Sequence, residues 1–240
     1  TGSEGLLGVI SEITVKLTKK PQVAKLVMAG FDSVRDCANT VAEIIKIGVI
    51  PAGLEMMDQF AIEASEAFAQ AGYPLGAKAL LLCELDGSKD LVKEDLNKVI
   101  NILSKASSVR VSENEEERLL FWKGRKSAFP AVGRLSPDYY CMDGTIPKRY
   151  LADVLEKISS LSAIYELRVA NVFHAGDGNL HPLILYDAAQ QGELEKAEGF
   201  GNDILKLCVD MGGSITGEHG VGIEKLDAMC HQYNSSELEI

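Results

Sequence analysis

The chain of 240 residues lacks the features that mark several specialised classes of protein. Its 24 basic residues are outnumbered by 35 acidic ones, and the net charge of −11 repels a phosphate backbone, so a nucleic-acid partner is excluded on electrostatic grounds. No apolar run approaches the roughly 20 residues that span a bilayer, and the first residues show no secretory-signal pattern. The five cysteines are scattered and odd in number, which argues against a disulfide framework. These absences predict a globular protein of the cytoplasm.

Both ends of the chain have the character of a sequence that was cut from a longer one. The chain opens without a methionine on a glycine-rich stretch, residues 1–5, and an alternation of apolar and polar residues around Ile13, Val15 and Leu17 predicts a strand. Its last residues, 238–240, follow a helical pattern that has no capping signal. We therefore expect an excised fragment of a longer protein, truncated at its C-terminus.

Between the ends, strand-like and helix-like segments alternate in two rounds. The predicted strands are residues 23–31, 54–57, 78–85, 109–112, 139–143, 168–173 and 183–186. The predicted helices are residues 34–48, 58–71, 91–105, 113–128, 147–160 and 193–211. The rounds favour two ferredoxin-like split β-α-β units, and the fold class is predicted as α+β, an antiparallel sheet with helices on one face.

The stretch VFHAGDGNLHPLILY, residues 172–186, contains two of the four histidines of the chain. His174 and His181 flank a loop with Asp177-Gly178, and Asp-Gly supplies the backbone conformations that close a hairpin. A hairpin requires antiparallel neighbours and places the two imidazoles at facing strand ends.

A second stretch, GGSITGEHGVG at residues 212–222, places Glu218 and His219 between glycines, where the backbone can turn sharply. Together with His174 and His181, this pair supplies the ligands of an open catalytic metal site and a base. The competing interpretation is that the histidines only cap strand ends. Because three of the four histidines lie in two glycine-rich loops, the metal site is favoured. His231 lies in a polar tail and receives no role.

Four cations, Lys123, Arg125, Lys126 and Arg134, gather around the only tryptophan, Trp122. They could form a pocket for a small anion. On charge pattern alone, a surface face that balances the preceding glutamates is the better interpretation.

Five segments resemble the C-terminal, substrate-binding half of the FAD-linked oxidases of the vanillyl-alcohol oxidase superfamily, in the branch of glycolate oxidase and of D-lactate and D-2-hydroxyglutarate dehydrogenases. The segments are TGSEG at 1–5, GLEMMD at 53–58, WKGRKSAFPAVGRLSPDYYCMDGTIP at 122–147, VANVFHAGDGNLHPLILYD at 169–187 and SITGEHGVG at 214–222. The resemblance implies an FAD-dependent enzyme that oxidises a small 2-hydroxy acid, such as glycolate or D-lactate, to the 2-oxo acid.

The resemblance also implies roles for individual residues. It makes His174, His181 and Glu218 ligands of a divalent metal such as zinc, and His219 the catalytic base. The implied substrate-binding residues are Arg125, which would grip the substrate carboxylate and so reverses the interpretation of the cationic group, and Asn179.

Two further implications concern specificity and the flavin. A lysine that binds the second carboxylate in the hydroxyglutarate enzymes falls at Cys141, which favours a monocarboxylate. Gly2, Ser3 and Gly5 would contact FAD, held mainly by an upstream domain. The implied division is residues 1–20 as the end of that FAD-binding domain and residues 21–240 as the substrate or cap domain.

The implied partners are the iron–sulfur subunit and a second flavin-like subunit of a glycolate oxidase complex, with membrane association only through them. Two alternatives stay open at this point. One is a metal-dependent hydrolase that uses His174, His181 and Glu218 around zinc, with His219 activating water. The other is a noncatalytic interaction module.

Overall fold

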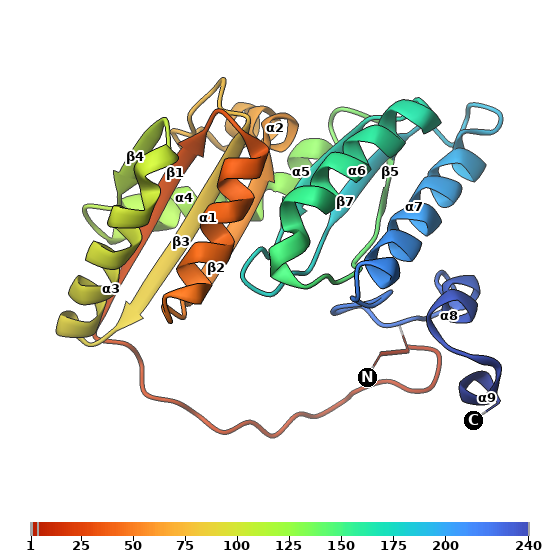
Figure 1. The fold of residues 1–240 in the computed structure, drawn as a ribbon, viewed down its shortest axis with the longest axis horizontal. Coiled ribbons are helices and arrows are strands. Elements are labelled where there is room, and N and C mark those ends of the chain that lie inside the picture. The colour runs from red at the N-terminus through yellow and green to blue at the C-terminus, as the bar shows by residue number, and fades with distance from the viewer. Residues whose placement is uncertain (1, 4, 240) are drawn as a thin grey trace.

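A computed structural model describes residues 2, 3 and 5–239. The contributions of Thr1 and Glu4 to the predicted glycine-rich segment, and of Ile240 to the predicted helical end, lie outside the described residues. The fold is built on a seven-stranded sheet in the order β4-β1-β3-β2-β6-β7-β5, and every pairing is antiparallel (Figure 1). The predicted α+β class with an antiparallel sheet is confirmed.

The first half of the chain forms the first ferredoxin-like unit, because its strand order β4-β1-β3-β2 is the one that two split β-α-β motifs produce. Its elements are β1 (Val23–Phe31), α1 (Val34–Lys46), β2 (Gly53–Asp58), α2 (Gln59–Ala69), β3 (Ala79–Gly87), α3 (Lys89–Ile102), the 3-10 helix η1 (Leu103–Lys105) and β4 (Ser108–Val111). The side chains of Ser33 and Asp58 accept the backbone N–H groups of Asp36 and Ala61 and so cap the N-terminal ends of α1 and α2.

The second half contributes the remaining three strands, in the order β6-β7-β5, so the second ferredoxin-like unit has one strand fewer than the first. Its elements are α4 (Glu115–Lys126), α5 (Ala128–Val132), β5 (Asp138–Cys141), the 3-10 helix η2 (Lys148–Tyr150), α6 (Leu151–Tyr165), β6 (Val169–Phe173), β7 (Pro182–Tyr186), α7 (Glu193–Asp210), α8 (Leu226–Gln232) and α9 (Ser235–Leu238). The predicted helix 113–128 corresponds to α4, which ends at Lys126, and the short helix α5 that follows from Ala128 was not predicted.

The two units meet at a short seam between β2 and β6, where Met56 pairs with Phe173 and Met57 with Val172. This register places Glu55 opposite His174 and Asp58 opposite Asn171, one step beyond the ladder at either end. The seam therefore connects the first unit directly to the first predicted ligand of the site.

Helices cover both faces of the sheet, so the prediction of helices on one face is too narrow. Along β1, Val27 and Ala29 face a core shared with α1, α3, α6 and α7, which lie in front of the sheet in Figure 1. Leu26 and Met28 alternate with them and face a second core shared with α2, α4 and α5. Strands buried on both faces need a layer of helices on each side. The helix that connects β2 to β3 in the sequence, α2, contributes to the layer on the second face.

The strand predicted around residues 13–17 is not formed. Residues 8–21 have no regular secondary structure, and Ile13, Val15 and Leu17 are exposed. An alternating strand needs a neighbour to pair its backbone, and this segment instead passes below the sheet, from the side of α8 to the start of β1 (Figure 1). Among the described residues, no helix combines the length and apolar character that crossing a membrane requires.

Candidate metal and substrate site

The predicted hairpin is present between β6 and β7. The carbonyl of His174 accepts the N–H groups of Asp177, Gly178 and Asn179 at 3.0, 3.1 and 3.3 Å, and the N–H of His174 returns to Asn179 O at 3.1 Å. Gly178 has φ of 75°, which favours glycine. The turn thereby places His174 after one strand and His181 before the next.

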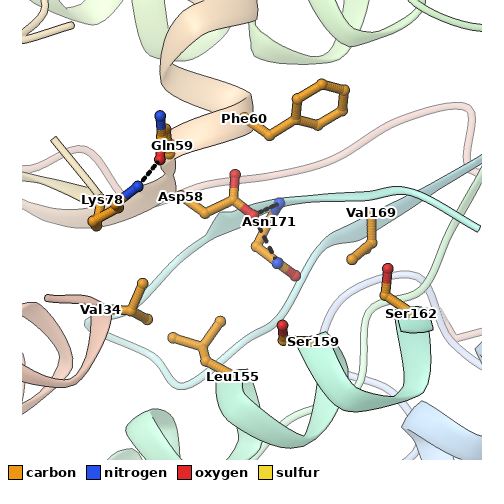
Figure 2. Close-up of a pocket in the computed structure, with 10 residues that line it drawn as sticks. All are labelled: Val34, Asp58, Gln59, Phe60, Lys78, Leu155, Ser159, Ser162, Val169 and Asn171. Carbon is orange, nitrogen blue, oxygen red and sulfur yellow. Dashed lines mark hydrogen bonds between the residues drawn. The ribbon is translucent and has the colours of Figure 1, made fainter. Parts of the chain in front are cut away.

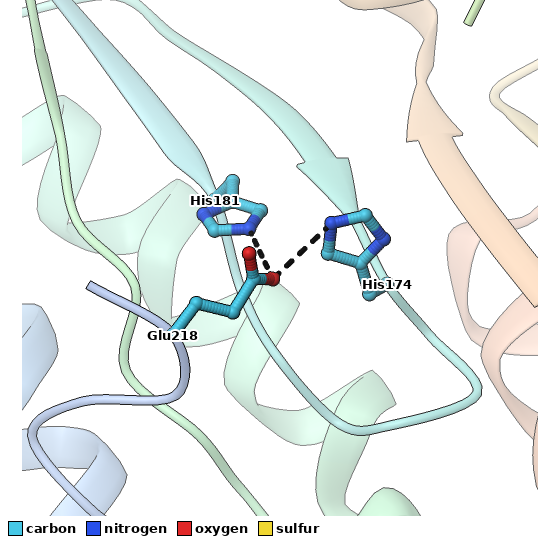
Figure 3. Close-up of side chains that lie close together, drawn as sticks. All are labelled: His174, His181 and Glu218. Carbon is cyan, nitrogen blue, oxygen red and sulfur yellow. Dashed lines mark hydrogen bonds and ion pairs between the residues drawn. The ribbon is translucent and has the colours of Figure 1, made fainter. Parts of the chain in front are cut away.

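The glycine-rich loop that carries Glu218 lies alongside the hairpin and completes a three-residue cluster. Figure 3 shows both imidazoles directed at the same carboxylate oxygen. Glu218 Oε1 lies 3.3 Å from His174 Nε2 and 3.2 Å from His181 Nε2. One ligand atom from each of the three residues lies within 4.8 Å of the others. Two histidines and one carboxylate are a donor set that zinc accepts.

The other ring nitrogen of each histidine contacts an acceptor. His174 Nδ1 lies 3.0 Å from Oε1 of Glu55, and His181 Nδ1 lies 3.4 Å from the carbonyl of Met142. When Nδ1 donates to these acceptors, the lone pair of Nε2 faces Glu218. Three electron-rich atoms then point at one another, an arrangement that a cation stabilises.

The surroundings shift the pKa values of the cluster in different directions. The hydrogen bond to Glu55 raises the pKa of His174, whereas burial lowers the pKa of His181. Burial acts to raise the pKa of Glu218, but the hydrogen bond and positive charge of His181 outweigh it and hold that pKa below its usual value. The lowered pKa values of Glu218 and His181 favour the ionised carboxylate and neutral imidazole that metal ligation needs, whereas the raised pKa of His174 means that a metal must displace a proton there.

Arg125 reaches the cluster through Glu55. Its Nε donates to Glu55 Oε2 at 3.0 Å, and Nη2 lies 2.8 Å from the same oxygen without a hydrogen bond to any described residue. The helix α4 can bring Arg125 this deep because Gly124 lies against the ring of Tyr73, where a Cβ atom would be 2.4 Å from that ring. Glu55 therefore links Arg125 to His174.

Glu55 is a site residue that the sequence did not reveal. It belongs to the segment GLEMMD, where it reads as one polar residue of a strand, and only its burial between Arg125 and His174 shows its role. An isolated acid in an otherwise apolar strand is the signal that could have found it, since an unpaired carboxylate is rarely buried.

The four predicted cations do not form one pocket. Arg134 lies over the ring of Phe68 at 4.2 Å, while Lys123 and Lys126 are exposed. Trp122 donates its indole N–H to Glu84. Of the four, Arg125 is the one that reaches the cluster.

His219 and Asn179 both lie next to the cluster. The ring of His219 stacks on that of His181 with 5.4 Å between centroids, and its side chain is 43% exposed. Asn179 is buried and donates from Nδ2 to Glu218 Oε1 at 2.6 Å, while its Oδ1 has no hydrogen-bond partner among the described residues. Asn179 thus holds the carboxylate, and its role towards substrate stays a prediction.

Comparison with known proteins places this geometry in a family. Residues 20–240 match the family described as "FAD linked oxidases, C-terminal domain". The chain belongs to this family. The resemblance predicted from the motifs is thereby confirmed.

Two relatives place the chain within the FAD-linked oxidases. Glycolate oxidase subunit GlcD of Escherichia coli (strain K12) is 60% identical over 240 residues, which cover 99% of this chain and 48% of that protein. The mitochondrial D-lactate dehydrogenase [cytochrome] of Arabidopsis thaliana is 31% identical over 243 residues, covering 100% of this chain and 42% of that protein. The chain therefore spans about half the length of these relatives.

The fold is also similar to that of p-cresol methylhydroxylase solved with substrate bound. The TM-score is 0.68 at 13% sequence identity, and the match covers 92% of this chain and 49% of the other. At this identity the comparison supports the fold alone, which agrees with a member of the FAD-linked oxidase family.

The segment predicted to contact FAD lies against the loop of Glu218. Ser3 pairs with Gly220 in an antiparallel bridge, and the N–H of Val221 donates to Gly2 O at 3.3 Å. Gly5 follows in an exposed turn. The contact of Gly2, Ser3 and Gly5 with a flavin, and the domain division at residues 20 and 21, stay predictions.

A separate cavity of about 320 Å³ opens at the other end of the seam (Figure 2). It is lined by Val34, Asp58, Gln59, Phe60, Lys78, Leu155, Ser159, Ser162, Val169 and Asn171. None of these belongs to the histidine cluster. In this member of the FAD-linked oxidases, the cavity and the predicted site are therefore separate features.

Proposed function

We propose that the chain is the substrate-binding domain of an FAD-dependent enzyme that oxidises a small 2-hydroxy acid to the 2-oxo acid. Family membership supports FAD dependence, and the relatives named glycolate oxidase subunit and D-lactate dehydrogenase support the substrate class. The observation that carries the proposal is the convergence of His174, His181 and Glu218 on one point. Arg125 lies nearby, because it pairs with Glu55, the carboxylate that contacts His174. The hydrolase alternative receives no support from the family.

His174, His181 and Glu218 would hold a divalent metal such as zinc. With ligand bonds of about 2.0–2.2 Å, adjacent donor atoms of a tetrahedral site lie ~3.4 Å apart. The two distances from Glu218 Oε1 to the imidazole nitrogens, 3.3 and 3.2 Å, fit that spacing. The contact of His174 with Glu55 is the carboxylate–histidine arrangement that orients metal ligands. When bound, the metal supplies a positive charge that lowers the pKa of a substrate hydroxyl.

The remaining site residues would orient the substrate and move its proton. Arg125 would pair with the substrate carboxylate through Nη2, which lies 2.8 Å from Glu55 Oε2 but makes no hydrogen bond with a described residue, and would select 2-hydroxy acids over plain alcohols. His219, half-exposed beside His181, would take the hydroxyl proton. FAD, when bound, supplies the acceptor for the hydride of the substrate carbon.

Cys141 supports a monocarboxylate substrate. A cysteine carries no positive charge in either protonation state, and burial raises the pKa of this thiol to about 12, so the side chain stays neutral and offers no cation to a second carboxylate. We therefore propose glycolate or D-lactate rather than a dicarboxylate.

We also propose that the enzyme works in the cytoplasm beside an iron–sulfur subunit and a second flavin-like subunit. The name "subunit" of the Escherichia coli relative supports assembly with partners. The five free cysteines support a reducing compartment. Co-purification of these subunits with the tagged full-length protein from the cytoplasmic fraction tests this part.

The metal and activity claims are tested together in a full-length flavoprotein that contains this domain. The parent should contain one zinc per chain by elemental analysis and reduce a dye with glycolate or D-lactate faster than with D-2-hydroxyglutarate. His174→Ala and Glu218→Ala should lose zinc and at least about a hundredfold of the turnover, because each removes a ligand. Chelation should abolish activity and added Zn²⁺ restore it.

His231→Ala is the matched control. This histidine pairs with Asp210 at 2.9 Å, away from the cluster, so zinc content and turnover should equal those of the parent. Unchanged zinc in both ligand variants would sink the metal assignment, and turnover with none of the three acids would sink the substrate class.

A further inference from the structure

Asp143 is a completely buried carboxylate that lies beneath the loop of Glu218. Its Oδ2 accepts three consecutive backbone N–H groups, those of Gly217, Glu218 and His219, at 3.1, 2.8 and 2.7 Å. The loop therefore wraps around a single oxygen atom. A carboxylate makes strong, charge-assisted hydrogen bonds of this kind.

Lys225 closes the other side of the same arrangement. Its side chain is 1% exposed, and its amine pairs with Asp143 Oδ1, donates to Gly220 O at 2.8 Å and lies 3.5 Å from Thr216 Oγ1. The three N–H donors of the ammonium thus have three acceptors. Thr216 Oγ1 also accepts the N–H of Gly220 at 2.8 Å, so residues 216–225 are tied together around the ion pair.

The side chains that this loop presents are much less restrained than its backbone. Those of Glu218 and His219 are 52% and 43% exposed, while the residues that hold their N–H groups are buried. The directions in which the carboxylate and the imidazole leave the chain are consequently set from below, by Asp143 and Lys225.

A contribution to stability alone does not explain why Asp143 and Lys225 form a buried ion pair. Burying two charges costs desolvation energy that an apolar pair of similar volume would avoid, so such pairs are weak evidence of stabilisation. An ionised acceptor that can hold three N–H groups at once offers what an apolar pair lacks, which is a fixed backbone under the two functional side chains.

We propose that Asp143 and Lys225 are positioning residues, a buried ion pair that presents Glu218 to the metal and His219 to the substrate. This inference rests on the proposed function. It assigns to the pair a geometric role that is separable from its contribution to folding.

The test uses the full-length flavoprotein, with Zn²⁺ alone as the probe. Asp143→Asn and Lys225→Met each leave one buried charge without its partner and should therefore lower the melting temperature. Each should also raise the dissociation constant for zinc by about 10- to 100-fold. The neutral double variant, Asp143→Asn with Lys225→Met, should recover most of the melting temperature. Its zinc affinity should stay at least about tenfold weaker, because an amide oxygen holds the three N–H groups less firmly.

Two further measurements keep the test decisive if the charged variants fold poorly. Thr216→Val removes the contacts of this hydroxyl with Gly220, Asp143 and Lys225 but leaves the ion pair, so it should reduce both zinc affinity and melting temperature less than either charged single variant. Amide exchange at residues 217–219 should be about fivefold faster in the double variant than in the parent, since the loss of a hydrogen bond worth about 1 kcal/mol changes the opening equilibrium by that factor. Asp36→Asn, which removes an exposed partner of Lys105, is the control and should change none of these values.

The outcomes separate the two proposals. Zinc affinity that returns to the parental value in the double variant overturns the positioning role and leaves a structural one. A parent that takes up no zinc overturns the metal site, and with it the presentation of Glu218. Unchanged amide exchange at residues 217–219 overturns the restraint of the loop whatever the metal result.

Discussion

The two ends of the seam between β2 and β6 carry equivalent polar pairs with different neighbours. At one end Glu55 contacts His174, and it also accepts from the guanidinium of Arg125. At the other end Asp58 accepts from the backbone and side-chain N–H groups of Asn171 at 2.9 and 2.8 Å, both neutral donors. Both carboxylates are on β2, whereas Asn171 lies within β6 and His174 directly follows that strand.

The difference between these ends shows that the charge of the neighbouring group determines the role of each carboxylate in the seam. Burial raises the pKa of Asp58 to about 6, because the lost solvation outweighs the hydrogen bonds that its carboxylate accepts from Ala61 and Asn171. Its oxygen caps α2 through Ala61, which is a structural role. Glu55 has a fixed cation beside it and can therefore orient an imidazole of the proposed metal site.

The largest loss of stability is expected when Arg125, the cation at the Glu55 end of the seam, is removed. Arg125→Leu leaves Glu55 buried without its guanidinium and should lower the free energy of unfolding by about 3–5 kcal/mol, because an uncompensated buried charge is strongly unfavourable. Urea unfolding of the purified protein measures this loss.

A double-variant cycle isolates the cause of that loss. Glu55→Gln combined with Arg125→Leu removes both charges and should be more stable than Arg125→Leu alone. If the two single losses simply add, the ion pair does not distinguish the ends of the seam.

The next effect concerns the pH dependence of the Asp58 end. A carboxyl whose pKa is about 6 in the folded protein and 3.8 when unfolded stabilises the fold below the lower value, and that stability is lost as pH rises through 6. The parent should therefore lose up to about 3 kcal/mol between pH 4 and pH 7 relative to Asp58→Asn, which keeps a capping side chain.

Urea unfolding at both pH values measures the difference between parent and Asp58→Asn. Any hydrogen bond lost by the asparagine lowers its stability at both pH values alike, so only the change in the difference matters. Parallel pH profiles would show that Asp58 is not destabilised by its neutral surroundings.

The sequence predicted the side chains that bear the chemistry but not those that support them. His174, His181 and Glu218 lie in glycine-rich loops, and the Asp177-Gly178 pair predicted the hairpin. The acid at Glu55 interrupts an apolar strand but does not indicate its partner, and Asp143 and Lys225 carry no local signal. Their partners are 119, 76 and 82 positions away, in contacts that only the folded chain makes.

Two errors in the predicted fold have similar causes. The alternation at residues 13–17 describes only one strand, and a strand forms only if a partner lies beside it. The pattern of α2 identifies a helix between β2 and β3 without indicating which face of the sheet it covers. Both depend on contacts distant in sequence, whereas caps and turns are local.

The smallest effect is expected for an ion pair that joins the same two units at the surface. Arg35 of α1 contacts Asp153 and Glu156 of α6 at 3.0 and 2.8 Å, with its side chain 47% exposed. Water and salt screen such contacts and side-chain entropy opposes them, so exposed pairs contribute little. Arg35→Ala should leave the urea midpoint unchanged within error at low and high salt. A loss comparable with that of Arg125→Leu would mean that the connection between the units depends on surface charge rather than on the buried seam.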